Sequence, residues 1–237
     1  MSTPALVTLQ LWGVPGRAVP RALVRMATDR RRLRGVPGLR FAKLLGTGSG
    51  ETFGLTDADA RHWALLTTWE DEAAADAFEQ GPVSRGWESL AEERWTARLV
   101  PISSRGSWSR QAPFGPAAAE RRPDEDGGRV AALTRARLVP RRAATFWRSV
   151  PPVSAALHAS PGLRFAVGVG EAPVGLQGTF SVWDSAASLR AFAYRGVAHQ
   201  RVIADTTRLG WYAEELFARF GVLSAAGTYR GLDPLGP

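Results

Sequence analysis

The chain has 237 residues, 45% of them hydrophobic and 22% charged, with a formal net charge of +8 and no cysteine. These figures argue against a disordered chain and exclude disulfides, zinc–thiolate sites, iron–sulfur clusters and thiolate-ligated haem. Arginine supplies almost all of the positive charge, and no nucleic-acid-binding motif accompanies it, so we expect no nucleic-acid partner. Residues 1–23 do not resemble a signal peptide, and no run of about 18 apolar residues occurs, so we expect a cytoplasmic protein.

The first half of the chain alternates apolar and polar residues in four stretches, which predicts strands ALVTLQLW, LRFAKLLG, HWALLTTW and ARLVPIS. Asp71 is a natural N-cap for an alanine-rich helix that reaches Phe78. Residues 88–108 predict an arginine-bearing helix followed by a short strand. GTGSG at residues 46–50 lacks the Lys-Ser/Thr of a phosphate loop, and we interpret it as a strand-ending turn. Lys43 is either a residue of an exposed strand edge or a charge partner for a cofactor carboxylate.

The segment 111–128 is rich in proline, alanine, glycine and charge, and it predicts an exposed linker. We therefore expect a first repeat over residues 1–110 and a second repeat over residues 129–237.

The second half repeats the first in order. PGLRFA begins at both Pro37 and Pro161, and strands are expected at VAALTRARLV, LRFAVGVG, GTFSVW and FGVLSA. Trp183 corresponds to Trp69, and Phe192 to Phe78, at the same separation. Asp184 or Ser185 caps the helix that follows, and residues 205–229 again predict a helix before the last strand.

Each half therefore has the order strand, helix, strand, strand, helix, strand. This is the ferredoxin-like βαββαβ unit. The fold class we expect is α+β, with two tandem ferredoxin-like repeats packed sheet to sheet as an intrachain α/β barrel. Such a barrel could leave a cavity between the sheets, lined by some of the nine tryptophans and ten phenylalanines, or most of these side chains could simply fill the core.

His199 is the histidine of greatest interest. At helical spacing it shares a stripe with Val202, Ile203, Thr206 and Gly210, so it is expected to face inward. It is either a packed core residue or the axial ligand of a haem iron with an open sixth position. Aligning Gly81 with Gly196 places Ser84 opposite it, so the histidine is specific to one half. His62, at the start of a strand, and His158, in a loop, are both expected to be exposed.

An ordered set of stretches resembles the spheroidene monooxygenase family of bacterial carotenoid ketolases. The set comprises PGLRFAKLLGTGSGETF, WALLTTWEDEAAADAF, RWTARLVPISSRGSW, RVAALTRARLVPRRAATFWRSVP, SVWDSAASLRAFAYRGVAHQRVI and GWYAEELFARF. It covers nearly the whole chain outside the linker. No single stretch is decisive, but the order is specific.

The resemblance implies more than the spacing does. It implies a haem b cofactor, O2 as oxidant, ferredoxin as electron donor, and an acyclic carotenoid that is oxidised at C-2 from a methylene to a ketone. In similar dimeric α/β-barrel haem proteins the proximal histidine lies on a helix of the second repeat, and His199 occupies a corresponding place. Arg195 and Arg201 would pair with the haem propionates, and Trp211, Phe217 and Phe220 would form pocket walls.

A carotenoid resides in a bilayer, so a peripheral contact with the inner membrane is also expected. Two other readings stay open on sequence alone. One is another α/β-barrel enzyme, either a cofactor-free monooxygenase or a haem-containing aldoxime dehydratase. The other is a haem- or hydrophobe-binding module without catalytic activity.

Overall fold

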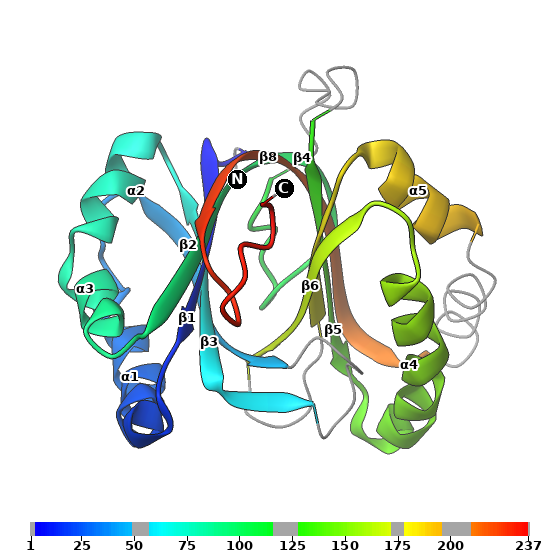
Figure 1. The fold of residues 1–237 in the computed structure, drawn as a ribbon, viewed down its shortest axis with the longest axis horizontal. Helices are drawn as coiled ribbons and strands as arrows, with labels where there is room; N and C mark the ends of the chain where they lie inside the picture. Colours follow the sequence, from blue (N-terminus) through cyan, green and yellow to red (C-terminus); the bar gives the residue numbers. More distant parts are fainter. Residues whose placement is uncertain (1–2, 49–56, 116–127, 172–177, 196–209, 237) are drawn as a thin grey trace.

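Eight antiparallel strands close into a barrel, with helices outside it on two opposite sides (Figure 1). The structure is a computed structural model that describes residues 3–48, 57–115, 128–171, 178–195 and 210–236. Around the barrel the strand order is β1-β3-β2-β6-β7-β5-β8-β4. The expected α+β class and barrel architecture are therefore confirmed.

The elements alternate in the same order in both halves. The first half contains β1 (Leu6–Gly13), η1 (Gly16–Ala18), α1 (Val19–Arg32), β2 (Leu39–Gly48), β3 (Ala58–Trp69), α2 (Glu72–Glu79), α3 (Pro82–Glu88) and β4 (Glu93–Gly106). The second contains β5 (Val130–Leu138), η3 (Pro140–Arg142), α4 (Ala143–His158), β6 (Leu163–Gly170), β7 (Gly178–Trp183), α5 (Ala186–Arg195) and β8 (Tyr212–Gly227). Among the described helices, none is long and apolar enough to cross a membrane.

The inside of the barrel is filled by side chains from all eight strands. Alternate residues of each strand point inward because successive side chains of a strand face opposite sides. They form one buried cluster that includes Leu9, Trp95, Phe165, Phe180 and Phe220. The expected cavity between the sheets is therefore wrong, because large aromatic side chains occupy that space.

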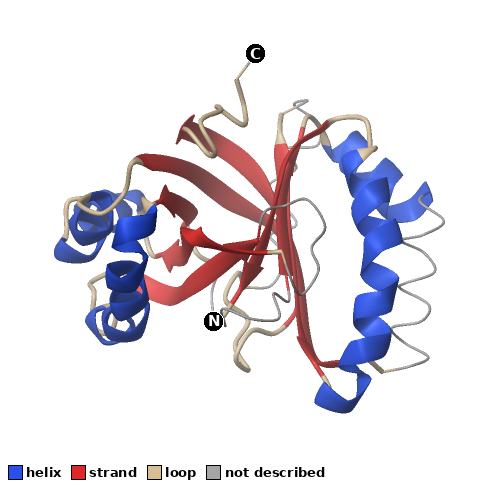
Figure 2. Ribbon diagram, turned by 60° about the horizontal axis from the view of Figure 1, so that its bottom comes forward, coloured by secondary structure: helices blue, strands red, loops and turns tan. Residues whose placement is uncertain are grey.

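The helices bury the outer faces of the barrel wall, as Figure 2 shows. Helices α1, α2 and α3 cover the outer face of the first half, and α4 and α5 cover that of the second. A separate core lies beneath each set. In the first half it runs from Trp69 at one end of the sheet to Trp12, Trp63 and Trp87 at the other.

Matching contacts occur in the two halves. The indole of Trp69 donates to Thr67 Oγ1 at 2.9 Å, and that of Trp183 donates to Ser181 Oγ at 2.9 Å. Trp69 packs on Phe78, with ring centroids 5.0 Å apart, and Trp183 packs on Phe192 at 5.3 Å. The repetition seen in the sequence is therefore also a repetition of contacts.

Three expectations about secondary structure are wrong. The helices expected within residues 88–108 and 205–229 are absent where the structure describes the chain: β4 starts at Glu93 and β8 at Tyr212. Trp95, Ala97 and Leu99 recur at a period of two and face the barrel interior, so the strand pattern prevails over the helix-forming residues. The helix capped by Asp71 reaches Phe78 as expected, since α2 spans Glu72–Glu79, and the short helix α3 follows it after Gly81. His158 is exposed as expected, but it ends α4 rather than lying in a loop.

Part of the expected exposed linker packs into the barrel instead. Phe114 is 1% exposed, and its ring meets Phe220 edge-on with centroids 4.9 Å apart. Burial of an aromatic ring contributes on the order of 2–3 kcal/mol. This contribution holds the start of the segment against the barrel. Residues 116–127 lie outside the described residues, and the domain boundaries stay a prediction.

Candidate functional site

Each half ends in a segment that folds back onto the barrel after its last strand. We call residues 107–115 the first tail and residues 228–236 the second tail. Their sequences, SWSRQAPFG and TYRGLDPLG, match in the aromatic second residue and in the closing Pro-x-Gly. Both begin after a glycine with positive φ, Gly106 at +92° and Gly227 at +100°. The aromatic residue of each tail, Trp108 or Tyr229, is buried in the barrel core.

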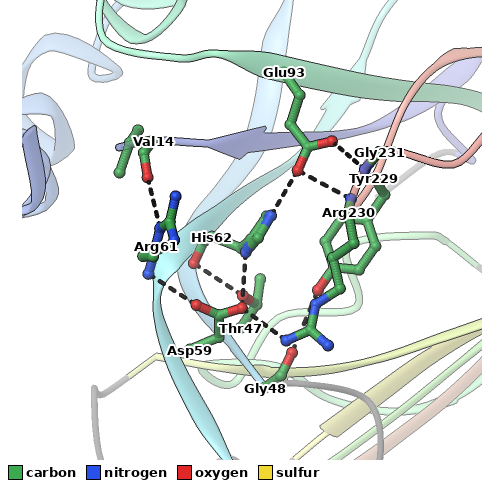
Figure 3. A network of polar contacts seen from close by, with 10 residues as sticks. All are labelled: Val14, Thr47, Gly48, Asp59, Arg61, His62, Glu93, Tyr229, Arg230 and Gly231. Carbon is green, nitrogen blue, oxygen red and sulfur yellow. Dashed lines mark hydrogen bonds and ion pairs between the residues drawn. The ribbon is translucent and has the colours of Figure 1, made fainter. Parts of the chain in front are cut away.

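A cluster of charged side chains, the His62 cluster, holds the second tail (Figure 3). His62 lies between two carboxylates: Nδ1 is 2.7 Å from Asp59 Oδ2, and Nε2 is 2.8 Å from Glu93 Oε1. Glu93 also accepts hydrogen bonds from the backbone N–H groups of Arg230 and Gly231, each at 2.9 Å. The Arg230 guanidinium donates to Asp59 at 2.9 Å. The ring of Tyr229 packs against His62 with centroids 4.8 Å apart.

This environment favours a protonated imidazole. Burial alone would lower the pKa of His62, but the hydrogen bonds to Asp59 and Glu93 outweigh it and raise that pKa above its usual value. Burial opposes ionisation of both carboxyls, yet the hydrogen bonds they accept lower the pKa of Asp59 and of Glu93. Burial raises the pKa of Tyr229 to about 12, so its hydroxyl stays neutral. The expectation of an exposed His62 is wrong, since the side chain is only 12% exposed.

A second cluster, the Arg135 cluster, holds the first tail in the corresponding way. Glu214 accepts from the backbone N–H of Arg110 at 2.8 Å, as Glu93 does from the second tail. Arg135 forms ion pairs with Glu214 and with Glu171. Glu171 also accepts from the Trp108 indole at 2.7 Å and from Lys43 at 2.7 Å. Lys43 is therefore a partner of a protein carboxylate.

The two clusters are built to fasten the tails. Their carboxylates and cations satisfy one another, and burial of Glu214 is outweighed by its hydrogen bonds, which lower its pKa to about 2. Within the described ranges, no group of three histidine or carboxylate side chains is arranged to hold a metal ion. The outer faces of the barrel are the other candidates for a binding site.

The outer faces of the two halves differ in side-chain size at equivalent positions. Counting back from Trp69 and from Trp183, Leu65 corresponds to Thr179, and its neighbours across the sheet correspond likewise. The larger set is Thr8, Gln10, Leu44 and Leu65 in the first half, and the smaller set is Ala132, Thr134, Gly168 and Thr179 in the second. The second half therefore has a flatter outer face.

The described helices cover the larger set of residues more completely than the smaller set. Thr8, Gln10, Leu44 and Leu65 are all buried beneath α1 to α3, whereas Ala132, Thr134 and Thr179 stay partly exposed beneath α4 and α5. The core of this layer in the second half comprises Val130, Leu157, Trp183, Ala186 and Leu189, which gather near the Trp183 end of the sheet. Among the described residues, no counterparts of the buried Trp12, Trp63 and Trp87 belong to that core. Over the part of the chain that the structure describes, the layer in the second half is thus less completely filled than the layer in the first half.

Comparison with known proteins now adds the family. No protein-family model matches the chain. A protein of Rhodobacter capsulatus is 37% identical over 233 residues, which cover 97% of this chain and 95% of that protein. The chain belongs to the spheroidene monooxygenase family. Relatives from Rubrivivax gelatinosus and Cereibacter sphaeroides are 42% and 34% identical, and the matches cover 83% and 90% of this chain and 74% and 65% of theirs. All three carry the name spheroidene monooxygenase.

Solved structures agree with the fold of this family member. A crystal structure of an aldoxime dehydratase superposes with a TM-score of 0.55 at 12% identity, covering 92% of this chain and 80% of that one. A second aldoxime dehydratase, crystallised with butyraldoxime, gives 0.54 at 10% identity, covering 92% and 79%. At these identities the likeness concerns the fold alone.

The structure brings together two of the residues that the resemblance suggested for this family member's pocket. Phe217 lies beside Thr134 across the β5–β8 pair, on the outer face of the second half. Trp211 is 2% exposed, donates to Thr145 Oγ1 of α4 at 2.9 Å and meets Phe146 edge-on. Phe220 faces the barrel interior, away from the outer face that carries Phe217, and its role as a pocket wall stays a prediction. His199 and Arg201 lie outside the described residues, and Arg195 ends α5 with its side chain outside them too.

Sequence reasoning missed the residues that fasten the tails. Asp59, Glu93, Arg135 and Glu171 were not singled out, although a signal was present. The tails themselves repeat, and Glu93 and Glu214 stand at matching positions two residues before Trp95 and Leu216. Aligning the tails would have pointed to these paired carboxylates.

Proposed function

We propose that this chain is a haem-dependent monooxygenase that oxidises the C-2 methylene of an acyclic carotenoid to a ketone, using O2 and reduced ferredoxin. Support comes from three relatives named spheroidene monooxygenase, one of them matched over nearly its full length. One observation carries the site: small side chains replace large ones on the outer face of the second half. A broad apolar group fits between that face and α4.

The residues there fit a haem. Its macrocycle is flat and mostly apolar, and Ala132, Thr134 and Thr179 offer it a flat surface of small uncharged side chains, with Arg219 of β8 beside Ala132. His199 would hold the haem iron through its imidazole, while Arg195 and Arg201 would pair with the propionates. Trp211 and Phe217 would close the sides of the pocket. Bound haem would supply the activation of O2, and the chain would exclude water and orient the polyene.

The proposed reaction balances over two turnovers at one carbon. Each turnover consumes one O2, two electrons and two protons, inserts one oxygen atom into a C–H bond and releases one water. The first turnover gives a secondary alcohol and the second gives a geminal diol. The diol loses water to give the ketone. Reduced ferredoxin, a one-electron carrier, would deliver the electrons in single steps.

We also infer that the two halves are tandem ferredoxin-like repeats. The strand order is β4-β1-β3-β2 in the first half and β8-β5-β7-β6 in the second, which is the same order. The matched tryptophan–hydroxyl and tryptophan–phenylalanine contacts support this origin. A duplicated scaffold explains how one half could keep a packed core while the other became a pocket.

The first experiment is an absorption spectrum of the protein produced with added haem, beside His199→Ala. We expect a Soret band in the wild type that is lost or shifted in the variant. A wild type that stays colourless under haem loading would overturn the haem proposal. Turnover of spheroidene with O2 and reduced ferredoxin then tests the reaction, and a loaded protein that consumes no substrate would contradict it.

His158→Ala is the matched control. His158 is exposed at the end of α4, so its replacement should leave both the Soret band and the fold unchanged. Urea unfolding of both variants separates loss of the ligand from loss of the fold. If both variants bind haem as the wild type does, neither histidine is the ligand.

A further inference from the structure

Helix α1 exposes apolar side chains along the ridge that points away from the barrel. Leu23 is 47% exposed and Val24 is 61% exposed, and both are among the few large hydrophobic side chains on the described surface. Pro20 and Ala27 are exposed beside them at helical spacing. Ala22, Asp29 and Leu33 lie on the opposite, buried face, so the exposed apolar residues belong to none of the buried clusters formed by the described residues.

Arginines surround this apolar ridge at both ends of α1. Arg17 and Arg21 are exposed at its start, and the run Arg30, Arg31, Arg32 and Arg34 is exposed at its end. The one acidic residue of the helix, Asp29, is fully buried and pairs with Arg25 and Arg32. Across the loop, Glu92 offsets Arg17 at 3.7 Å. The exposed face of α1 therefore carries a large positive charge around a small apolar centre.

A groove continues this surface between α1 and α3. It has a volume of about 470 Å³, and its lining includes Pro20, Val24 and Leu90, with Arg21 and Arg32 at its edges. Figures 1 and 2 show α1 at the outside of the first half, far from α4 and α5.

We propose that α1 is a docking surface for the anionic face of a lipid bilayer. Aliphatic side chains on the ridge would enter the boundary between headgroups and acyl chains, and the flanking arginines would pair with lipid phosphates. Arginine suits this position because its apolar stem can lie along the hydrocarbon while the guanidinium reaches the phosphate. This inference goes beyond the proposed function and does not depend on bound haem.

The pattern favours a lipid surface over an acidic protein. The exposed apolar residues of α1 are all aliphatic or proline, whereas protein interfaces are enriched in aromatic residues that fill a partner's pockets. Positive charge at both ends of an apolar ridge matches a flat, uniformly anionic plane. An acidic protein is the outcome that the test must separate.

Sedimentation of the full chain with vesicles tests the proposal. We expect binding to vesicles of mixed phosphatidylcholine and phosphatidylglycerol, weak binding to phosphatidylcholine alone, and a decline with added salt. Leu23→Ser with Val24→Ser should reduce binding to the mixed vesicles by about tenfold or more. Arg21→Gln with Arg31→Gln should reduce it by about fivefold for each arginine replaced.

A charge-matched control uses Arg110→Gln with Arg137→Gln, two exposed arginines outside α1. It should bind mixed vesicles as the wild type does. The proposal is overturned if wild-type protein fails to sediment with mixed vesicles at low salt, or if the control loses as much binding as the α1 variants. Binding to immobilised polyglutamate without binding to vesicles would assign the surface to an acidic protein and also overturn it.

Discussion

The layers between sheet and helices in the two halves share a topology but differ in how they are filled. In the first half, large side chains on the sheet meet α1 to α3 in a continuous core that ends in three tryptophans. In the second half, the core stops near Trp183, and smaller residues follow along the same face. The fold can combine a fully packed outer layer with a partly packed one. The barrel interior and the two tails form contacts that belong to neither layer.

The difference fits the proposed function. If the halves arose as repeats, one would keep the packing that stabilises the domain, and the other would give up apolar contacts on the face proposed to bind the ligand. The four predictions below compare the two halves. Two concern the outer layers, and two concern the clusters that hold the tails.

The largest effect is expected for the paired tryptophans. Trp69→Ala should lower the free energy of unfolding by about 4 kcal/mol, because a fully buried indole leaves a cavity in tightly packed surroundings. Trp183→Ala should cost about 2–3 kcal/mol, since its layer has fewer neighbours that resist collapse. Urea unfolding of both variants measures the difference. Equal losses would contradict the view that the second layer is less tightly packed.

The second largest difference is expected between the two tail clusters, in the stability lost when a carboxylate of each is replaced. Glu214→Gln should cost about 3 kcal/mol, because it leaves the buried Arg135 without one of its two charge partners. Glu93→Gln should cost about 1–2 kcal/mol, since its one amide oxygen can accept from only one of the two backbone N–H groups of the second tail, while His62 can release its proton rather than stay charged without a partner. The control is Arg135→Met with Glu214→Met, which should recover most of the loss in urea unfolding. A double variant as unstable as Glu214→Gln would argue against an unpaired charge as the cause.

An exchange of side-chain size tests the outer faces directly. Leu65→Thr should cost about 2 kcal/mol, because it places a hydroxyl and a void in a fully buried layer. Thr179→Leu, the reverse change at the equivalent position, should leave stability within about 1 kcal/mol, because the site is partly exposed. Thermal unfolding of the two variants gives the comparison, and a large loss in Thr179→Leu would show that the second face is already filled.

The smallest expected effect is a difference in pH dependence. The contribution of the His62 cluster to the free energy of unfolding should change with pH, and that of the Arg135 cluster should not. The raised pKa of His62 means that its contribution is complete below its unfolded pKa of about 6.5 and is lost as the pH rises through the folded pKa. The lowered pKa values of Asp59 and Glu93 add stability above about pH 4 that is lost on acidification. Unfolding free energies measured from about pH 5 to pH 9 should therefore decline on the alkaline side.

His62→Gln is the control for that decline. The Arg135 cluster contains no histidine, and its Glu214 has a pKa of about 2, so it should contribute a constant stability over this range. Removing His62 should then flatten the alkaline limb. A decline that persists in His62→Gln would place the titrating group elsewhere.

The sequence by itself determined the repeated order of elements, the α+β class and the barrel, because alternation of apolar residues is a local property that survives duplication. It also determined the helix caps: Asp71 accepts from the N–H of Ala74 at 2.8 Å, and Ser185 from that of Ser188 at 3.2 Å. Its ordered stretches were sufficient to suggest the family. It misjudged β4 and β8, where arginine- and glutamate-rich segments resemble helices until the inward faces of their strands are known.

Only the tertiary structure decided which polar residues meet. His62 and Glu93 are 31 positions apart, and Arg135 and Glu214 are 79 apart, so no local pattern links them. Their encounter follows from strand register and from the return of each tail to the barrel, which depend on the whole sheet. The different packing of the two outer faces also depends on the tertiary structure. It is seen only when the burial of each residue is compared with that of its counterpart in the other half.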